Sequence, residues 1–171
     1  EALWPTYVAA MAVGARSLAP HLARFVHLSS EMNVVDLGGA DGSLARCLAR
    51  LADGLCLTVV DRPVLQCAFA AADARAEELR GGHLRFIPGD LRELDAHRAE
   101  LAQADVIIAS NVMHLLGEEE RGHMLAAIAR AASPGATLVI YDQFVAPGKA
   151  DSAACLVVDW LLCGYRFDCS E

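Results

Sequence analysis

The stretch Val34-Val35-Asp36-Leu37-Gly38-Gly39-Ala40-Asp41-Gly42 carries an apolar run into a glycine-rich turn. A helix predicted over residues 44–52 follows at once. An apolar strand that passes through such a turn into a helix is typical of the first unit of a parallel α/β sheet. Glycine lets the chain turn sharply, and the start of the helix offers unpaired N–H groups and a positive dipole end. We therefore expect a ligand to lie against this turn.

Short apolar runs alternate with helical patterns on both sides of this stretch. Strands are predicted at 33–37, 55–60, 84–88, 105–110 and 136–142, and helices at 6–28, 44–52, 64–80, 94–101, 118–132 and 152–163. The runs are apolar throughout, as in strands covered on both faces. This order predicts an α/β fold, a Rossmann-like doubly wound parallel sheet with right-handed crossovers and helices on both faces. Pro20 is expected to break the first helix in two.

Composition excludes several classes of protein. The 171 residues are 55% hydrophobic with a mean hydropathy of +0.34, which excludes a disordered chain. No apolar run reaches the roughly 18 residues of a membrane span. The net charge is −8 and the basic residues are scattered, which argues against nucleic acid as a partner. The cysteines form no Cys-x-x-Cys pair, so we expect no metal site and a reduced, cytoplasmic protein.

Carboxylates stand where the second and third predicted strands end. Asp61 follows the glycine turn by about 20 residues, a distance that suits hydrogen bonds from ribose hydroxyls. Asp90 can accept a hydrogen bond from an adenine amine, and Leu91 can pack on the ring. Ser110 ends the fourth strand at the same edge. Together these residues predict a nucleoside site.

The charges near the turn indicate which nucleoside binds. Asp36 and Asp41 would crowd an anionic pyrophosphate but suit a cationic amino group. S-adenosylmethionine carries an ammonium and a sulfonium and no phosphate, so the charges favour this methyl donor. Ala40 interrupts the glycine pattern of dinucleotide sites. Arg62 could face the phosphate of NADP, so an NAD(P)-dependent oxidoreductase remains the alternative.

A histidine and an aspartate follow the fourth and fifth predicted strands. His114 would face the methyl group of a cofactor lying across the sheet. Asp142 ends the neighbouring strand. A carboxylate beside an imidazole holds its tautomer and stabilises its protonated form. We interpret this pair as a candidate general-base unit.

The sequence resembles the class I S-adenosylmethionine-dependent methyltransferases, and among them the small-molecule O-methyltransferases of the caffeate and acetylserotonin type. The resemblance implies that Gly38, with Gly39 and Gly42 beside it, holds the methionine part of the cofactor. It implies that Asp61 holds the ribose. The matching segments are 34–42, 60–63, 88–91, 111–114 and 135–140. The resemblance further implies that Asp90 and Leu91 bind the adenine. It also implies that His114 is the catalytic base and that Asp142 is an acid flanking it.

The sequence departs from this family at several places. Ala40 and Asp41 replace a glycine and a threonine of the usual turn, and Leu115-Leu116 replaces an Asp-Trp pair after the histidine. The first flanking acid is usually glutamate, and a second is expected near Tyr165. A cofactor-binding module without methyl transfer is therefore a second alternative.

The resemblance also sets expectations for the organisation of the chain. We expect a helical lead-in over residues 1–30, an S-adenosylmethionine-binding domain over 31–150, and a C-terminal helix of a truncated catalytic domain over 151–171. The family adds a helical dimerisation domain and two further strands, so we expect a piece of a longer, homodimeric protein that lacks its last strands. The expected reaction is methyl transfer to a hydroxyl of a small aromatic or secondary-metabolite acceptor.

Overall fold

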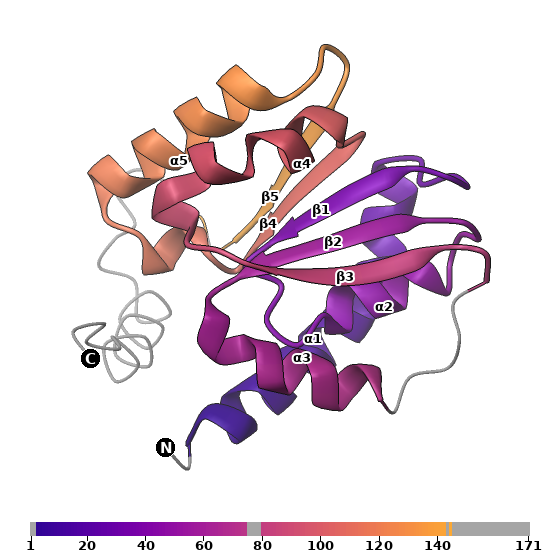
Figure 1. The fold of residues 1–171 in the computed structure, drawn as a ribbon. Helices are drawn as coiled ribbons and strands as arrows, with labels where there is room; N and C mark the ends of the chain where they lie inside the picture. Colours follow the sequence, from indigo (N-terminus) through magenta and orange to yellow (C-terminus); the bar gives the residue numbers. More distant parts are fainter. Residues whose placement is uncertain (1–2, 75–79, 143, 145–171) are drawn as a thin grey trace. The chain divides into compact units, whose positions relative to one another are not determined.

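The computed structural model describes residues 3–74, 80–142 and 144 (Figure 1). The chain divides into two compact units, Glu1–Tyr141 and Asp142–Glu171. Nearly all described residues belong to the first unit, so the fold below is the fold of that unit. The helix predicted at 152–163 lies outside the described residues, and so does Tyr165.

Five parallel strands form one sheet in the order β3-β2-β1-β4-β5. Their bounds are β1 Asn33–Leu37, β2 Cys56–Asp61, β3 His83–Pro88, β4 Val106–Ser110 and β5 Thr137–Tyr141. The order reverses between β1 and β4, where Asp36 is in register with Val59 on one side and with Ile108 on the other. This topology confirms the Rossmann-like doubly wound sheet. A switch point of this kind is where ligands bind, beyond the carboxyl ends of the strands.

Helices cover both faces of the sheet, as predicted (Figure 1). Helices α1, α2 and α3 pack on one face, and α4 and α5 pack on the other. The α-helices are α1 Leu3–Phe25, α2 Ser43–Ala49, α3 Gln66–Asp73, α4 Arg98–Gln103 and α5 Glu118–Ala131, and the 3₁₀ helices are η1 Pro63–Leu65, η2 Leu91–His97 and η3 Met113–Leu115. None of the helices in the described part of the chain has the length and apolar character needed to cross a membrane.

The apolar strands supply two separate cores, one on each face. Successive side chains of a strand point to opposite faces, so Val34 joins the core beneath α1, α2 and α3 while Val35 joins the core beneath α4 and α5. Leu57 and Ile108 belong to the first core, and Ile107 belongs to the second. Burial on both faces explains why the strands alternate so little between apolar and polar residues.

The prediction that Pro20 breaks the first helix is wrong. Helix α1 runs unbroken from Leu3 to Phe25 with Pro20 inside it. A proline inside a helix costs about 3 kcal/mol. Ala19 and Leu22, on either side of it, are almost completely buried in the core beneath α1. Packing of this face offsets the cost of the missing hydrogen bond and keeps one helix.

Further boundaries also differ from the prediction. The helix predicted at 94–101 is divided between the 3₁₀ helix η2 and α4, because the backbone of His97, at φ −107° and ψ 24°, departs from helical geometry. The fifth strand ends at Tyr141, one residue before Asp142. Asp142 therefore follows the strand and does not lie in it.

Candidate functional site at the carboxyl edge of the sheet

The turn after β1 follows a path that only glycine allows at three positions. Gly38 and Gly42 both have a φ of +76°, in the left-handed region. A Cβ atom on Gly38 would lie 2.3 Å from Cγ1 of Val112, and one on Gly39 would lie 2.4 Å from Oδ2 of Asp36. The backbone of the turn therefore packs closely against Val112, which follows β4, and against the Asp36 carboxyl.

Asp61 holds this turn through its side chain. Its Oδ2 accepts a hydrogen bond from the N–H of Ala40 at 2.8 Å, and its Oδ1 accepts one from the N–H of Arg62 at 2.7 Å. Ala40 has a φ of +50°, an uncommon angle for a residue with a side chain. Burial raises the pKa of Asp61 above its usual value, although both hydrogen bonds oppose the change. In the described part of the chain each oxygen accepts this one hydrogen bond, which leaves room for another from a ribose hydroxyl.

Asp36 is the most deeply buried charged group of the site. Its side chain is 1% exposed, and among the described residues its Oδ2 has no hydrogen-bond partner. Burial, and then the charges of Asp61 and Asp41, raise the pKa of Asp36 to about 7. A buried carboxyl with an unsatisfied oxygen is costly unless a donor reaches it. A cationic ligand group would meet that need.

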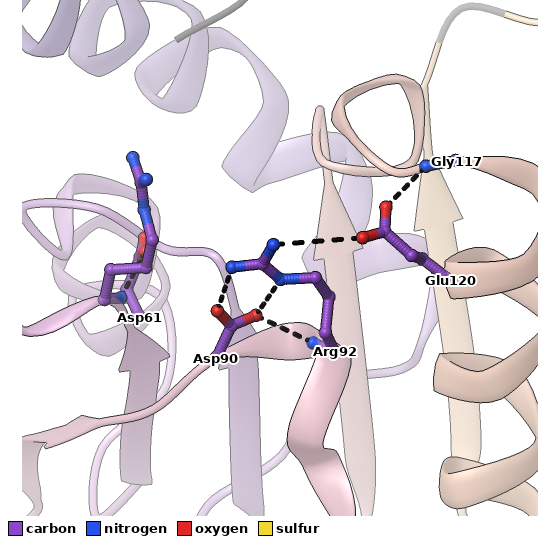
Figure 2. A network of polar contacts seen from close by, with 6 residues as sticks. Asp61, Asp90, Arg92, Gly117 and Glu120 are labelled. Atoms are coloured by element: carbon purple, nitrogen blue, oxygen red, sulfur yellow. Dashed lines mark hydrogen bonds and ion pairs between the residues drawn. The ribbon is translucent and has the colours of Figure 1, made fainter. Parts of the chain in front are cut away.

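Asp90 and Leu91 lie beside the same turn. A Cβ atom on Gly38 would be 3.5 Å from Cδ1 of Leu91, so the two residues face each other across a short gap. Asp90 caps the start of η2 by accepting a hydrogen bond from the N–H of Arg92 at 2.9 Å. The Arg92 guanidinium also binds this carboxylate and lowers the pKa of Asp90 (Figure 2). Asp90 is thus an ionised acceptor at the edge of the site.

The segment after β4 carries His114. Val112 packs against the turn at Gly38, and η3, which includes the partly exposed His114, follows it. Arg121 of α5 donates hydrogen bonds to the carbonyl oxygens of Leu116 at 2.8 Å and of Met113 at 3.4 Å. These contacts fix the segment on both sides of the histidine.

Ser110, at the end of β4, lies in the same segment. The Asn111 side chain donates a hydrogen bond to the Ser110 hydroxyl at 3.3 Å. Asn111 itself has a φ of +56°, and its N–H donates to the carbonyl of Tyr141 at 2.8 Å. Ser110 is only partly buried, so its hydroxyl stands at the carboxyl edge of the sheet.

The geometry brings four carboxylates to one edge of the sheet. The charges of Asp61 and Asp41 act on Asp36, and the charge of Asp90 acts on Asp61. Within the described ranges, no group of three or more His, Cys, Asp or Glu residues could hold a metal ion. The arrangement is suited to an organic cation with a nucleoside, because the carboxylates can accept hydrogen bonds from hydroxyl, amine and ammonium groups.

Residues 34–135 match the family described as a methyltransferase domain. The chain belongs to this family. It is 31% identical over 123 residues to the tetracenomycin polyketide synthesis 8-O-methyl transferase TcmO of Streptomyces glaucescens, a match that covers 72% of this chain and 34% of that protein. It is 30% identical over 130 residues to the acetylserotonin O-methyltransferase of Mus musculus, covering 73% of this chain and 32% of that protein.

A solved methyltransferase structure has the same fold. The mitomycin 7-O-methyltransferase MmcR superposes with a TM-score of 0.71 and 26% sequence identity, over 91% of this chain and 43% of that one. This chain spans about a third of the length of the curated relatives it matches. The matched family region contains the turn, the acidic strand ends and the His114 segment.

The pairing of His114 with Asp142 stays a prediction. Asp142 comes directly after β5, whose Tyr141 is in register with Ser110 of β4. Asp142 belongs to the second compact unit of the chain, whereas His114 belongs to the first.

Sequence reasoning missed a buried arginine of the site. Arg46 of α2 is 7% exposed and donates hydrogen bonds to the carbonyl oxygens of Asp41 and Phe69, the latter at 3.2 Å. Its guanidinium lies 4.7 Å from the centre of the Phe69 ring and 3.4 Å from Asp73. The sequence carries no signal for this role, because an arginine on a predicted helix is ordinarily exposed. Arg46 thus ties the glycine turn to α3.

Proposed function

We propose that this chain binds S-adenosylmethionine and serves methyl transfer to a hydroxyl group of a small aromatic or secondary-metabolite acceptor. The observation that carries the proposal is Asp36, a buried carboxyl beneath the glycine turn whose Oδ2 has no hydrogen-bond partner among the described residues. The charges of Asp61 and Asp41 act on this carboxyl and, together with its burial, raise the pKa of Asp36. Such a site attracts a cation and repels a phosphate. Family membership and the O-methyltransferase relatives support the same conclusion.

The described residues fit each part of this cofactor. The turn at Gly38, Gly39 and Gly42, with Asp36 and Asp41, would hold the cationic methionine part. Asp61 would accept hydrogen bonds from the ribose. Asp90 would accept one from the adenine amine while Leu91 packs against the ring, and the Ser110 hydroxyl would border the same cofactor.

The cofactor supplies a methyl group on a positively charged sulfur, which an oxygen nucleophile can displace. His114 would accept the proton of the acceptor hydroxyl, a role that typically contributes about 100- to 10,000-fold. Asp142 would orient the imidazole and stabilise its protonated form. His114 is partly exposed as a residue, although the Nε2 atom of its imidazole is buried. Arg121 holds the backbone on both sides of it. Such fixed positioning of reacting groups can itself accelerate a reaction strongly.

Further aspects of the function rest on charge and resemblance alone. We propose that the partner is a small-molecule acceptor and not nucleic acid, in line with a net charge of −8. We also propose a cytoplasmic location and a homodimeric parent protein. Two alternatives remain for testing, an NAD(P)-dependent oxidoreductase and a cofactor-binding module that transfers no methyl group.

Calorimetric titration of the chain with S-adenosylhomocysteine, NADH and NADPH separates the candidates. We expect binding of S-adenosylhomocysteine alone, and weaker binding after Asp36→Asn. Binding of a nicotinamide dinucleotide without S-adenosylhomocysteine would refute the proposal. If the parent protein methylates a phenolic acceptor, His114→Ala should cut turnover at least about 100-fold while cofactor affinity changes little. Cofactor binding without turnover against any hydroxyl acceptor would favour the non-catalytic module.

A further inference from the structure

Arg92 lies between two carboxylates at the edge of the cofactor site (Figure 2). Its Nε donates to Oδ1 of Asp90 at 2.9 Å, and its Nη2 donates to Oδ2 of the same carboxylate. This two-point contact matches the planar fork of a guanidinium to the plane of a carboxylate. The Arg92 side chain is still 43% exposed, so the contact is not a requirement of core packing.

The contact leaves Asp90 with a restricted capacity to accept hydrogen bonds. Its Oδ1 accepts from both the backbone N–H and the Nε of Arg92, which uses both lone pairs of that oxygen. Its Oδ2 accepts from Nη2 only, among the bonds of the described residues. One acceptor position therefore remains on this carboxylate, at a fixed orientation.

A second contact holds Arg92 from the opposite side. Its Nη1 lies 3.9 Å from Oε1 of Glu120 in the first turn of α5. The other oxygen of Glu120 accepts a hydrogen bond from the N–H of Gly117 at 2.7 Å, which fixes that side chain at the start of the helix. Arg92 is thus held between η2 and α5, and its guanidinium keeps one orientation toward Asp90.

We propose that Arg92 is a positioning residue that makes Asp90 selective for an amino-purine. The two hydrogen bonds from the Arg92 side chain hold the Asp90 carboxylate in one orientation. One acceptor position is left for the exocyclic amine of adenine, and the carboxylate cannot rotate away from it. A keto oxygen at the same place would face an acceptor with no hydrogen between them, which costs binding energy. This inference rests on the proposed function, in which Asp90 meets the adenine.

The test compares two ligands that differ at this one group. The full chain is titrated calorimetrically with S-adenosylhomocysteine and with its deaminated counterpart, S-inosylhomocysteine. We expect the adenine form to bind at least about 10-fold more tightly to the unaltered chain, as for a lost hydrogen bond to a charged group. Arg92→Met should reduce this ratio to about 3-fold or less. Arg92→Lys, which keeps the charge but loses the two-point contact, should give an intermediate ratio.

Arg130→Met provides a matched control. Arg130 of α5 forms an exposed ion pair with Asp95 of η2 at 2.9 Å, so the two arginines bridge the same pair of elements. Its removal takes away the same charge but should leave the preference for adenine unchanged. A general loss of structure would weaken both ligands equally, and the ratio of their affinities would then stay constant.

The outcomes separate this inference from the proposed function. If the unaltered chain binds S-adenosylhomocysteine but Arg92→Met leaves the ratio unchanged, the inference is wrong and the proposed function stands. Tighter binding of S-adenosylhomocysteine by Arg92→Met would also overturn it, because Arg92 would then compete with adenine for Asp90. If the unaltered chain binds neither ligand, both conclusions fail together.

Discussion

At the scale of single residues, Asp36 should make stability depend on pH. Its pKa in the folded chain is about 7, against an ordinary value of 3.8. Between these values the folded chain holds a proton that the unfolded chain has lost. The free energy of unfolding should therefore fall as the pH rises from about 4 to about 7, and this contribution should level off above that range.

The variant Asp36→Asn isolates this contribution. We expect a shallower decline between pH 4.5 and 7, measured as the free energy of unfolding in urea at several pH values. Asp61, whose pKa is also raised, keeps its own contribution in the variant, so some decline should persist. Parallel pH profiles for the two proteins would show that Asp36 ionises normally in the folded chain.

Two glycines give opposite expectations for one and the same substitution. Gly38→Ala should destabilise the chain by about 2 kcal/mol or more, because the new Cβ would meet Cγ1 of Val112 at 2.3 Å and φ is +76°. Gly14→Ala, in α1 with no atom within 4 Å of its Cβ position, should stabilise by about 0.5–1 kcal/mol. Urea denaturation midpoints measure both changes. Equal effects would mean that the turn is less tightly packed than described.

At the scale of elements, Arg46 joins α2, the glycine turn and α3. Arg46→Met should destabilise the chain by about 2–4 kcal/mol, because two backbone carbonyls lose their donor inside the protein. It should also weaken S-adenosylhomocysteine binding, since Asp41 lies in the turn that Arg46 holds. The control is Arg50→Met, an exposed residue at the end of the same helix, which should change stability by less than about 0.5 kcal/mol. A comparable loss in both variants would contradict a specific role for Arg46.

Sequence patterns predicted the strands well. Each strand is found within a residue or two of its predicted range, because strands buried on both faces are runs of apolar residues. Local patterns failed at Pro20, where the packing of Ala19 and Leu22 on the sheet outweighs the local preference of proline. They failed again at 94–101, because the change of backbone angle at His97 leaves no mark in the apolar pattern.

The carboxylates of the candidate site could be predicted from the sequence, but its arginines could not. Asp36, Asp61 and Asp90 could be found because parallel strands bring their carboxyl ends to one edge. Arg46 and Arg92 could not be found, because their roles depend on contacts with residues whose position only the fold decides. The arginines that organise the site are therefore tertiary features, whereas its carboxylates follow from the order of the strands.

At the scale of the whole molecule, cofactor binding should appear as added thermal stability. A ligand present at 100 times its dissociation constant stabilises a protein by about 2.7 kcal/mol. For a chain of this size that corresponds to a rise in Tm of about 5–10 °C. We expect this rise with S-adenosylhomocysteine and none with NADP at the same concentration, because the carboxylates of the site and a net charge of −8 disfavour phosphates.

The rise in Tm should depend on the carboxyl edge of the sheet alone. Asp61→Ala should remove most of it at the same ligand concentration, since Asp61 would hold the ribose and also holds the turn through the N–H of Ala40. Asp105→Asn is the matched control. The Oδ2 of Asp105 accepts a hydrogen bond from the N–H of Asn33, which lies at the start of β1 and so at the opposite ends of the strands from the site. That variant should keep the full rise even if its own Tm is lower. If both variants lose the rise in Tm, the rise depends on global stability and not on the site. If Asp61→Ala keeps the full rise, Asp61 does not bind the ribose.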